Sequence, residues 1–113
     1  MTKKLLGGVL IGLLSACGGA SAEGAHAEVP AQYQGEIQST DAARGEQLFT
    51  DICGACHEGG GAPDLRAEAH AAALVRMIVR EGEGTMPPLD TSRLSEEDLE
   101  AVLAYMQSVH AVN

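Results

Sequence analysis

The sequence contains no tryptophan, and its aromatic side chains are limited to one phenylalanine and two tyrosines. Aromatic residues usually supply much of the apolar area that a small core buries. A domain of fewer than about 80 residues seldom builds a sufficient core alone, and it is usually stabilised by a disulfide, a metal or another bound group. The scarcity of aromatic residues therefore indicates that something besides side chains fills the middle of this protein.

Lysine is also scarce, because Lys3 and Lys4 are the only two and the other cations are five arginines. Sixteen acidic residues outnumber these cations and give a formal net charge of −9 at pH 7. Proteins that bind nucleic acid carry clustered basic residues, so the composition argues against nucleic acid as a partner. The acidity favours solubility, and it also predicts docking partners with basic surfaces.

A membrane-spanning segment is missing as well, because the apolar run at residues 5–14 has ten residues and a span needs roughly 20. Preceded by Lys3 and Lys4, this run is typical of an export signal. Residues 14–17 (LSAC) resemble the lipobox of bacterial lipoproteins, where the signal is cut before a cysteine that then receives lipid. We therefore expect residues 1–16 to be a signal peptide and Cys17 to be the lipid anchor. Cleavage of this signal peptide removes Lys3 and Lys4, so the formal net charge of the mature chain is −11 instead of −9.

Cleavage after Ala22 is the alternative, because residues 20–22 (ASA) also fit the small-residue pattern of a secretory signal. The exported protein would then be soluble in the periplasm. The cysteine count favours the lipoprotein, since three cysteines in an exported protein leave one odd thiol and lipidation of Cys17 accounts for it. We expect the protein to act outside the cytoplasm, at the extracytoplasmic face of a membrane.

The chain divides into three parts. Residues 18–38 are rich in Gly, Ala, Ser, Glu and Gln and show no hydrophobic periodicity, a composition typical of a flexible linker. The expected organisation is a signal peptide at 1–16, a lipid-anchored flexible tether at 17–38, and one domain of about 75 residues at 39–113.

Helical periodicity dominates the expected domain. Apolar residues recur at spacings of three and four over about 41–53, 67–81 and 95–110. Gly82 is placed to end the second helix, and Ser95 with Asp98 forms a capping box at the start of the third. No segment shows the alternation of a strand, so the predicted fold class is all-α.

Residues 53–57 (CGACH) form the C-x-x-C-H signature of covalent haem attachment. Two thiols at this spacing reach the two vinyl groups on one haem edge, and the adjacent imidazole falls beneath the iron. Cys53 and Cys56 are therefore predicted to bind one haem c, and His57 to be an axial ligand. A haem would also fill the core that the few aromatic residues leave open.

The motif has three other interpretations. A disulfide between Cys53 and Cys56 would close a strained small loop. A thioredoxin-like redox pair is expected beside a βαβ unit, whereas no strand is predicted. A structural zinc site needs a second pair of Cys or His at close spacing, and the remaining histidines are scattered. The export signal and the aromatic-poor helical domain favour haem over all three.

The predicted second axial ligand is Met86. It lies in the loop sequence GTMPP at residues 84–88, where glycine gives freedom and proline prevents a helix. A thioether opposite His raises the reduction potential of a haem. Met77 and Met106 are the alternatives on apolar helix faces, where methionine usually packs in the core. A second histidine, His70 or His110, is the remaining alternative.

From about residue 41 to residue 109, the chain resembles the small bacterial members of the class I cytochrome c family. Gly45 and Phe49 are similar to the Gly and aromatic residue on the family's N-terminal helix. Val102 and Tyr105 are similar to the positions that cross them on the C-terminal helix. The resemblance implies three main helices and loops wrapped around one covalently bound haem.

The resemblance extends to both loops beside the predicted ligands. Residues 62–65 (APDL) resemble the loop after the haem motif. The family pattern implies that the carbonyl of Pro63 accepts a hydrogen bond from Nδ1 of His57, and that Leu65 presses on the haem. Residues 82–87 resemble the methionine-ligand loop. Many family members dock through lysines around the haem edge, and the mature chain departs from them in having none.

The predicted function is that of a monomeric electron carrier between larger redox complexes at the membrane surface. No acid–base pair, nucleophile or phosphate-binding loop is recognisable, so we expect no substrate turnover. A permanently bound cytochrome subunit of a membrane oxidoreductase complex is one alternative, which would need an apolar contact face. A haem-based sensor is the other, and it would need an open sixth site, against which Met86 argues.

Overall fold

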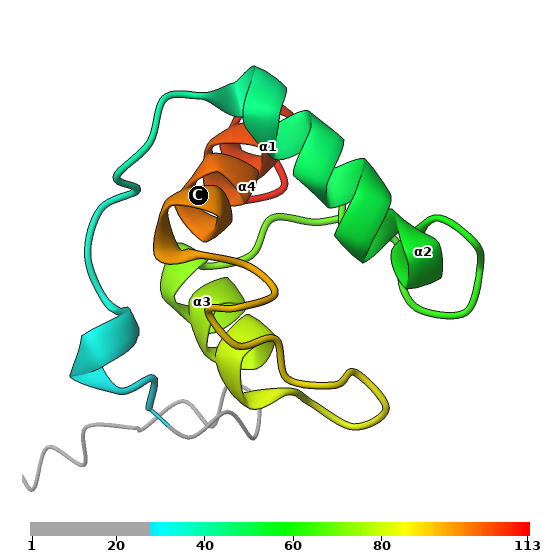
Figure 1. Cartoon of the computed structure of the whole chain (residues 1–113), viewed down its shortest axis with the longest axis horizontal. Coiled ribbons are helices and arrows are strands. Elements are labelled where there is room, and N and C mark those ends of the chain that lie inside the picture. The colour runs from blue at the N-terminus through cyan, green and yellow to red at the C-terminus, as the bar shows by residue number, and fades with distance from the viewer. Residues whose placement is uncertain (1–27) are drawn as a thin grey trace, which may run out of the picture.

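The computed structural model describes residues 28–113, so the expected signal peptide, both cleavage sites and Cys17 lie outside the described residues. Figure 1 shows the helices α1 (Ala42–Leu48), α2 (Gly54–His57), α3 (Ala72–Glu81) and α4 (Glu96–Ser108). A 3-10 turn, η1 (Ala31–Tyr33), precedes them, and a π-helical turn, η2 (Phe49–Cys53), joins α1 to α2. Within the described residues the β pairing is limited to two isolated bridges. The all-α fold class is confirmed.

The centre of the fold is the crossing of α1 over α4. Gly45 of α1 lies directly against the backbone of Ala101, where a Cβ atom would overlap the carbonyl oxygen. Phe49 and Tyr105 pack beside this contact with ring centroids 5.2 Å apart and tilted by 59°. Phe49 and Tyr105 belong to a core cluster that includes the apolar face of α4. The resemblance implied this crossing of the first and last helices.

The first helical segment runs further than the periodicity predicted, because α1, η2 and α2 follow one another without a break from residue 42 to residue 57. Asp41 caps the start, since its side chain accepts a hydrogen bond from the backbone N–H of Arg44 at 3.0 Å. In η2 the N–H of Gly54 bonds to the carbonyl of Phe49, five residues earlier. This extra residue in the turn changes the direction in which the following side chains point.

The second helix, α3, begins five residues later than expected, at Ala72. The preceding residues are taken up by a pairing with the C-terminal segment. The N–H of His70 donates to the carbonyl of Ala111 at 2.9 Å, and the N–H of Asn113 donates to the carbonyl of His70 at 3.1 Å. The helix ends where predicted, at Gly82, whose φ of +76° favours glycine.

The third helix, α4, has the predicted cap, because the hydroxyl of Ser95 accepts a hydrogen bond from the N–H of Asp98 at 3.1 Å. Its apolar residues are almost fully buried, with Leu99 and Met106 each 1% exposed and Leu103 0% exposed. None of the helices between residues 28 and 113 combines the length and the apolar character that crossing a membrane requires.

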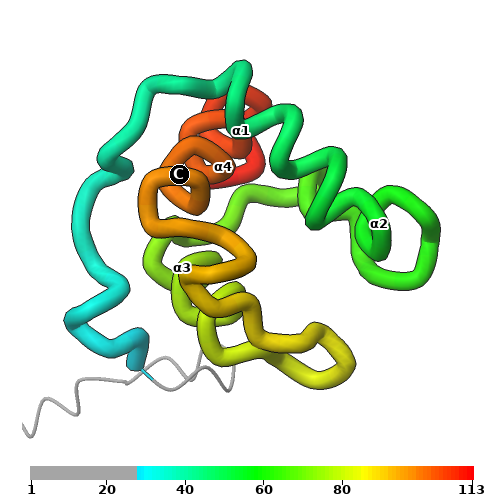
Figure 2. Tube along the Cα trace, viewed as in Figure 1, coloured from blue at the N-terminus to red at the C-terminus, as the bar shows by residue number. Residues whose placement is uncertain are grey.

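The end of the expected tether is held against the domain. Arg76 of α3 donates to the backbone carbonyls of Tyr33, Gly35 and Glu36 at 2.9–3.0 Å. The same guanidinium bonds both carboxylate oxygens of Glu100, at 2.7 and 3.1 Å. Residues 33–36 therefore belong to the packed part of the chain. Figure 2 shows this cyan segment on the side of the domain opposite α2.

Candidate functional site

A cleft of about 210 Å³ brings together residues from the haem motif and from the loop after α3. Most of its walls are apolar. The lining residues are Ile52, Cys53, Cys56, His57, Met86, Pro87, Leu89 and Arg93. The predicted haem-attaching cysteines, the predicted axial histidine and the predicted axial methionine thus face one space, although Met86 is 29 residues beyond His57 in the chain.

Both cysteines of the motif are free thiols in the structure, with Cys53 half-buried and Cys56 exposed. Burial and, second to it, the nearby charge of Glu58 together raise the pKa of the Cys53 thiol to about 11. A disulfide oxidoreductase needs the opposite, a cysteine pKa below the ordinary value. The surroundings of Cys53 therefore argue against the thioredoxin-like alternative.

His57 is the last residue of α2, and a single hydrogen bond sets the direction of its ring. Nδ1 lies 2.7 Å from the carbonyl oxygen of Pro63, and since a carbonyl can only accept, Nδ1 carries the proton. This leaves Nε2 as the ring nitrogen with a lone pair for a metal. Such a bond to the outer nitrogen orients a metal-binding imidazole and increases its basicity.

Met86 is presented to the cleft by a tight turn. The N–H and the carbonyl of Met86 pair with those of Glu83, at 2.9 and 3.1 Å, across Gly84 with its φ of +57°. The turn folds back on Gly82, where a Cβ atom would lie 2.8 Å from the carbonyl oxygen of Met86. The N–H of Leu89 donates to the carbonyl of Val79 at 2.7 Å and fixes the far end of the loop to α3.

The alternative ligands lie elsewhere within residues 28–113. Met106 is 1% exposed inside the core cluster of α4, and Met77 lies on α3; neither lines the cleft. His110 is exposed, with a φ of +61°. His70 is held by the C-terminal segment, and its Nε2 is buried without a hydrogen-bond partner among the described residues. Of the three methionines in this part of the chain, Met86 alone borders the cleft.

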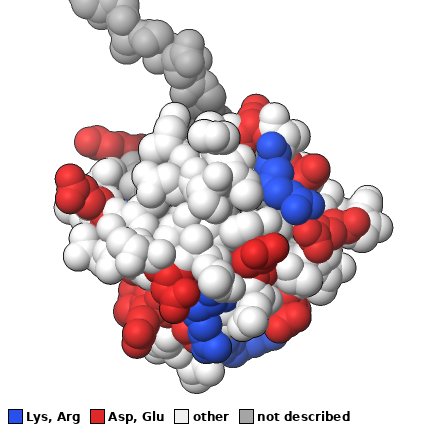
Figure 3. All heavy atoms as spheres, turned by 90° about the horizontal axis from the view of Figure 1, so that it is seen from above, with Lys and Arg blue, Asp and Glu red and all other residues white. Residues whose placement is uncertain are grey.

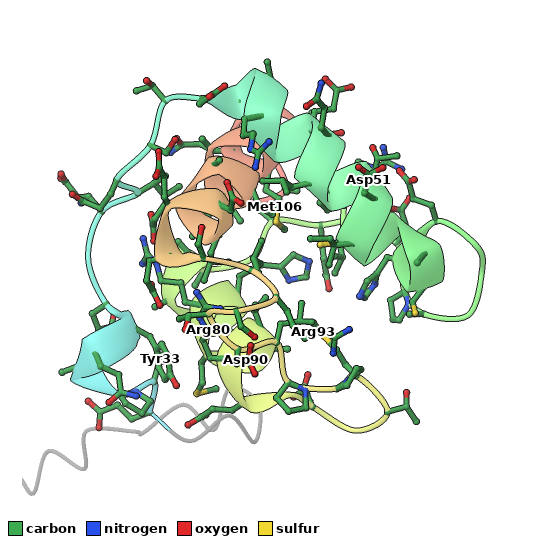
Figure 4. All side chains as sticks on the ribbon, viewed as in Figure 1. Tyr33, Asp51, Arg80, Asp90, Arg93 and Met106 are labelled. Carbon is green, nitrogen blue, oxygen red and sulfur yellow. The ribbon has the colours of Figure 1, made fainter. Side chains whose placement is uncertain are left out.

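Leu65, which the resemblance assigned to the haem pocket, is partly buried and packs against the core cluster that contains Phe49. Other cleft residues were not predicted from the sequence, among them Ile52, Leu89 and Arg93. In Figure 4, Arg93 extends from the segment before α4 toward the side of the domain where α2 lies. The backbone of Arg93 is held in a turn with Asp90, whose side chain accepts a hydrogen bond from the N–H of Arg93 at 3.2 Å.

A larger hollow, of about 450 Å³, lies between η1, α3 and the start of α4 and contains none of the predicted ligands. Two arginines that line it are already engaged. Arg76 bonds Glu100 and the N-terminal segment as described above. Arg80 donates to the carbonyls of Leu89 and Leu94 and to the carboxylate of Glu96. The smaller cleft, with its thiols, imidazole and thioether, is therefore the candidate site.

Comparison with known proteins identifies the family. The family model for "Cytochrome C oxidase, cbb3-type, subunit III" matches residues 40–106. Cytochrome c6 of Cyanidium caldarium is 37% identical over 83 residues, which cover 64% of this chain and 74% of that protein. Cytochrome c6 of Cyanidioschyzon merolae is 34% identical over 82 residues, 63% of this chain and 77% of that protein.

A third relative is the cytochrome c subunit of 4-cresol dehydrogenase [hydroxylating] from Pseudomonas putida. It is 35% identical over 69 residues, which cover 59% of this chain and 61% of that subunit. No solved structure matches the chain significantly.

The donor set of the cleft fits the cofactor of this family. Cys53 and Cys56 offer two free thiols for thioether bonds, His57 offers Nε2 because its Nδ1 is bonded to Pro63, and the walls are apolar. The match over residues 40–106 spans more than half of the chain. The chain therefore belongs to the cytochrome c family that this model describes, and it is a small class I c-type cytochrome that carries covalently bound haem and transfers electrons.

Proposed function

We propose that Cys53 and Cys56 attach one haem c, that His57 and Met86 are its axial ligands, and that the protein carries single electrons between larger redox proteins without substrate turnover. The observation that supports this most directly is the cleft itself, which gathers four side chains of the required chemistry from two distant segments. Thioether ligation opposite an imidazole raises the reduction potential, and apolar walls that exclude water act in the same direction.

The chain's own residues provide the preorganisation that electron transfer needs. Pro63 holds the imidazole of His57 in one orientation and in one tautomer. The turn between Glu83 and Met86 fixes the thioether side of the cleft, and Gly82 permits the loop to fold back against α3. A bound haem supplies the one-electron chemistry, and a rigid surrounding keeps the structural change between its two oxidation states small.

The charge distribution supports basic redox partners. Four of the five arginines form ion pairs with acidic side chains of the described residues, so most cations are neutralised locally. Figure 3 shows this on one face, where blue side chains lie against red ones and further red side chains stand apart. The acidic surplus attracts a basic partner at long range, and electron-transfer interfaces are typically small, below about 1,200 Å².

For the cellular setting we propose export and lipid anchoring through Cys17, with the haem domain at the extracytoplasmic face of a membrane. The support is the sequence of residues 1–17, which lies outside the described residues. Cleavage after Ala22, giving a soluble periplasmic monomer, is the alternative.

A second candidate function is that of a permanently bound cytochrome subunit of an oxidoreductase complex. Two findings favour it: the matching family model is named for an oxidase subunit, and one relative is the cytochrome subunit of a dehydrogenase. A fixed subunit buries a stable contact face, whereas a mobile carrier relies on weak, charge-steered encounters. The two candidates therefore differ in how their reaction rates respond to salt.

The experiment that tests the axial ligands is spectroscopic. The exported protein should contain covalently bound haem, be reduced and reoxidised reversibly by one electron, and show the weak near-infrared band of methionine-ligated ferric haem. Met86→Ala should keep the haem, lose this band and lower the reduction potential. Met77→Ala is the matched control and should keep the band. If Met77→Ala or Met106→Ala abolishes the band while Met86→Ala keeps it, the assignment of Met86 is wrong.

A further inference from the structure

The loop between His57 and Leu65 carries the carbonyl group that orients the predicted axial histidine. It starts at Glu58, directly after His57, and ends at Asp64, directly after Pro63. Three consecutive glycines, 59–61, lie inside it, and Gly60 has a φ of +82°. Glycine-rich chain of this kind has a large conformational freedom. The position of the Pro63 carbonyl therefore depends on contacts that close the loop from outside.

Arg66 makes those contacts at both ends of the loop. Its Nη2 lies 2.9 Å from a carboxylate oxygen of Glu58, the first loop residue. Its Nε lies 3.6 Å from Oδ1 of Asp64, the last loop residue, and its backbone N–H donates to the same oxygen at 2.9 Å. One guanidinium thus joins the beginning of the loop to its end.

The same guanidinium is tied to the core. Cζ of Arg66 lies 5.8 Å from the centroid of the Phe49 ring, within the range of a cation–π interaction. Phe49 is 1% exposed and packs against Tyr105 of α4. Arg66 therefore connects the loop to the buried crossing of the first helical segment and α4.

We propose that Arg66 is a positioning residue for the axial histidine: by closing the loop of residues 58–64 onto Phe49, it holds the carbonyl of Pro63 against Nδ1 of His57. The inference rests on the proposed function in one respect, namely that His57 ligates the haem iron. The side chains of Arg66 and Glu58 are 39% and 34% exposed. Because partly exposed ion pairs add little to global stability, variants of Arg66 should fold and take up haem.

The proposal predicts that the reduction potential rises, whereas the loss of a positive charge alone would lower it. A strong hydrogen bond from Nδ1–H makes the imidazole a better electron donor, which favours ferric iron and lowers the reduction potential. Loosening the loop weakens this bond and raises the potential. Removing a positive charge near the haem has the opposite effect, because it stabilises the more positive ferric state and lowers the potential.

The test uses haem-loaded protein with Arg66→Lys, which keeps the charge but replaces the planar fork that reaches two carboxylates by a single ammonium. Arg44→Lys is the matched control, since Arg44 also makes a forked contact, at 3.2 Å from Nε and from Nη2, but to Asp98. The readouts are the reduction potential and the solvent exchange of the His57 Nδ1 proton, followed by NMR in the reduced protein.

We expect Arg66→Lys to raise the potential and to accelerate exchange of the Nδ1 proton, while Arg44→Lys leaves both at the wild-type values. Arg66→Met should accelerate the exchange at least as much. A wild-type potential and exchange rate in Arg66→Lys, or equal changes in Arg44→Lys, would overturn the proposal. So would an Arg66→Met protein with a lowered potential and unchanged exchange, which is the result of charge alone. A wild-type protein without haem would instead contradict the proposed function.

Discussion

Gly45 and Ala101 are in direct backbone contact where α1 crosses α4. A methyl group on Gly45 would overlap the carbonyl oxygen of Ala101 and lie 2.9 Å from Cβ of Tyr105. The absence of a side chain at this one position lets the two helices approach closely and brings the rings of Phe49 and Tyr105 together. The contact sets the distance between α4, which carries most of the core, and α1, the start of the continuous helical segment that ends in the haem motif.

Gly45→Ala should destabilise the protein, although alanine is the better helix former by about 1 kcal/mol. Overpacking a tight contact costs about 1–3 kcal/mol, so after the gain in helix propensity we expect a net loss of up to about 2 kcal/mol in the free energy of unfolding. Urea titration of the haem-loaded protein measures it. Glu46→Ala, at the exposed neighbouring position of α1, is the control. Equal stabilities of the two variants would show that the helices separate at little cost.

Removing both thiols, with Cys53→Ala and Cys56→Ala in the exported chain, should leave an apoprotein that does not fold cooperatively. The two buried clusters, around Phe49 and around Leu99, are small and both border residues of the cleft. Without haem between them, too little apolar area is buried for a domain of this size. Circular dichroism during heating provides the measurement, with the exported wild-type protein as the reference. A helical apoprotein with a sharp melting transition would contradict the expectation.

Glu100 should make stability sensitive to acid. Burial raises the pKa of Glu100, but hydrogen bonds from Arg76 and from the N–H of Gln38, with the charge of Arg76, outweigh burial and lower the pKa below 4.5. A lowered folded-state pKa contributes stability above the unfolded value, and this contribution is lost as pH falls through the folded value. Urea midpoints from about pH 6 to about pH 3 should therefore fall less steeply in Glu100→Gln than in the wild type.

The control for the acid experiment is Glu46→Gln, an exposed carboxylate of α1 that forms no ion pair within the described residues. Its midpoint should follow the wild-type curve. Parallel curves for Glu100→Gln and the wild type would mean that the contact with Arg76 does not depend on ionisation of Glu100.

Salt should slow electron transfer to the native oxidant. Charges farther apart than about 8 Å are largely screened at physiological ionic strength, so steering by the acidic surface weakens as salt is added. The second-order rate constant across an ionic-strength series is the observable, and a steep fall supports a mobile, acidic carrier. A flat or rising profile would favour the permanently bound subunit, with the acidity serving solubility.

Cys17→Ser should either release the protein from membranes or block its processing, because the lipid-accepting thiol is removed. Fractionation of cells and mass spectrometry of the N-terminus measure both effects. Wild-type protein that begins at Glu23 and remains in the soluble fraction would show that cleavage after Ala22 prevails.

Local patterns predicted the parts of the structure that depend on neighbouring residues. The cap at Ser95 and the stop at Gly82 are contained within a few residues, and both are where the sequence placed them. The Gly- and Pro-rich loop, which excludes the helical packing expected for Met77 and Met106, singled out Met86, and the structure places Met86 at the cleft. In each case the deciding interaction is short in sequence, so composition and spacing are sufficient.

Contacts made through distant backbone groups were not predictable. The start of α3 at Ala72 depends on the pairing of His70 with the C-terminal segment. The attachment of residues 33–36 depends on Arg76, whose acceptors are carbonyl groups that every residue has. Arg66 and Arg93 look alike in the sequence, yet one closes a loop and the other borders the cleft. These roles arise from the fold, and no local spacing encodes them.

The π-turn at Phe49–Cys53 makes the number of residues between the core and the haem motif a fixed quantity. The turn already holds one residue more than an α-helical turn, so a further inserted residue would rotate every later side chain by about 100° about the helix axis. An insertion after exposed Thr50 would therefore turn Cys53 and Cys56 together away from the cleft, although the C-x-x-C-H letters would remain intact. For a chain of this kind, the length of the segment ahead of the motif is as much a part of the haem-attachment signal as the motif itself.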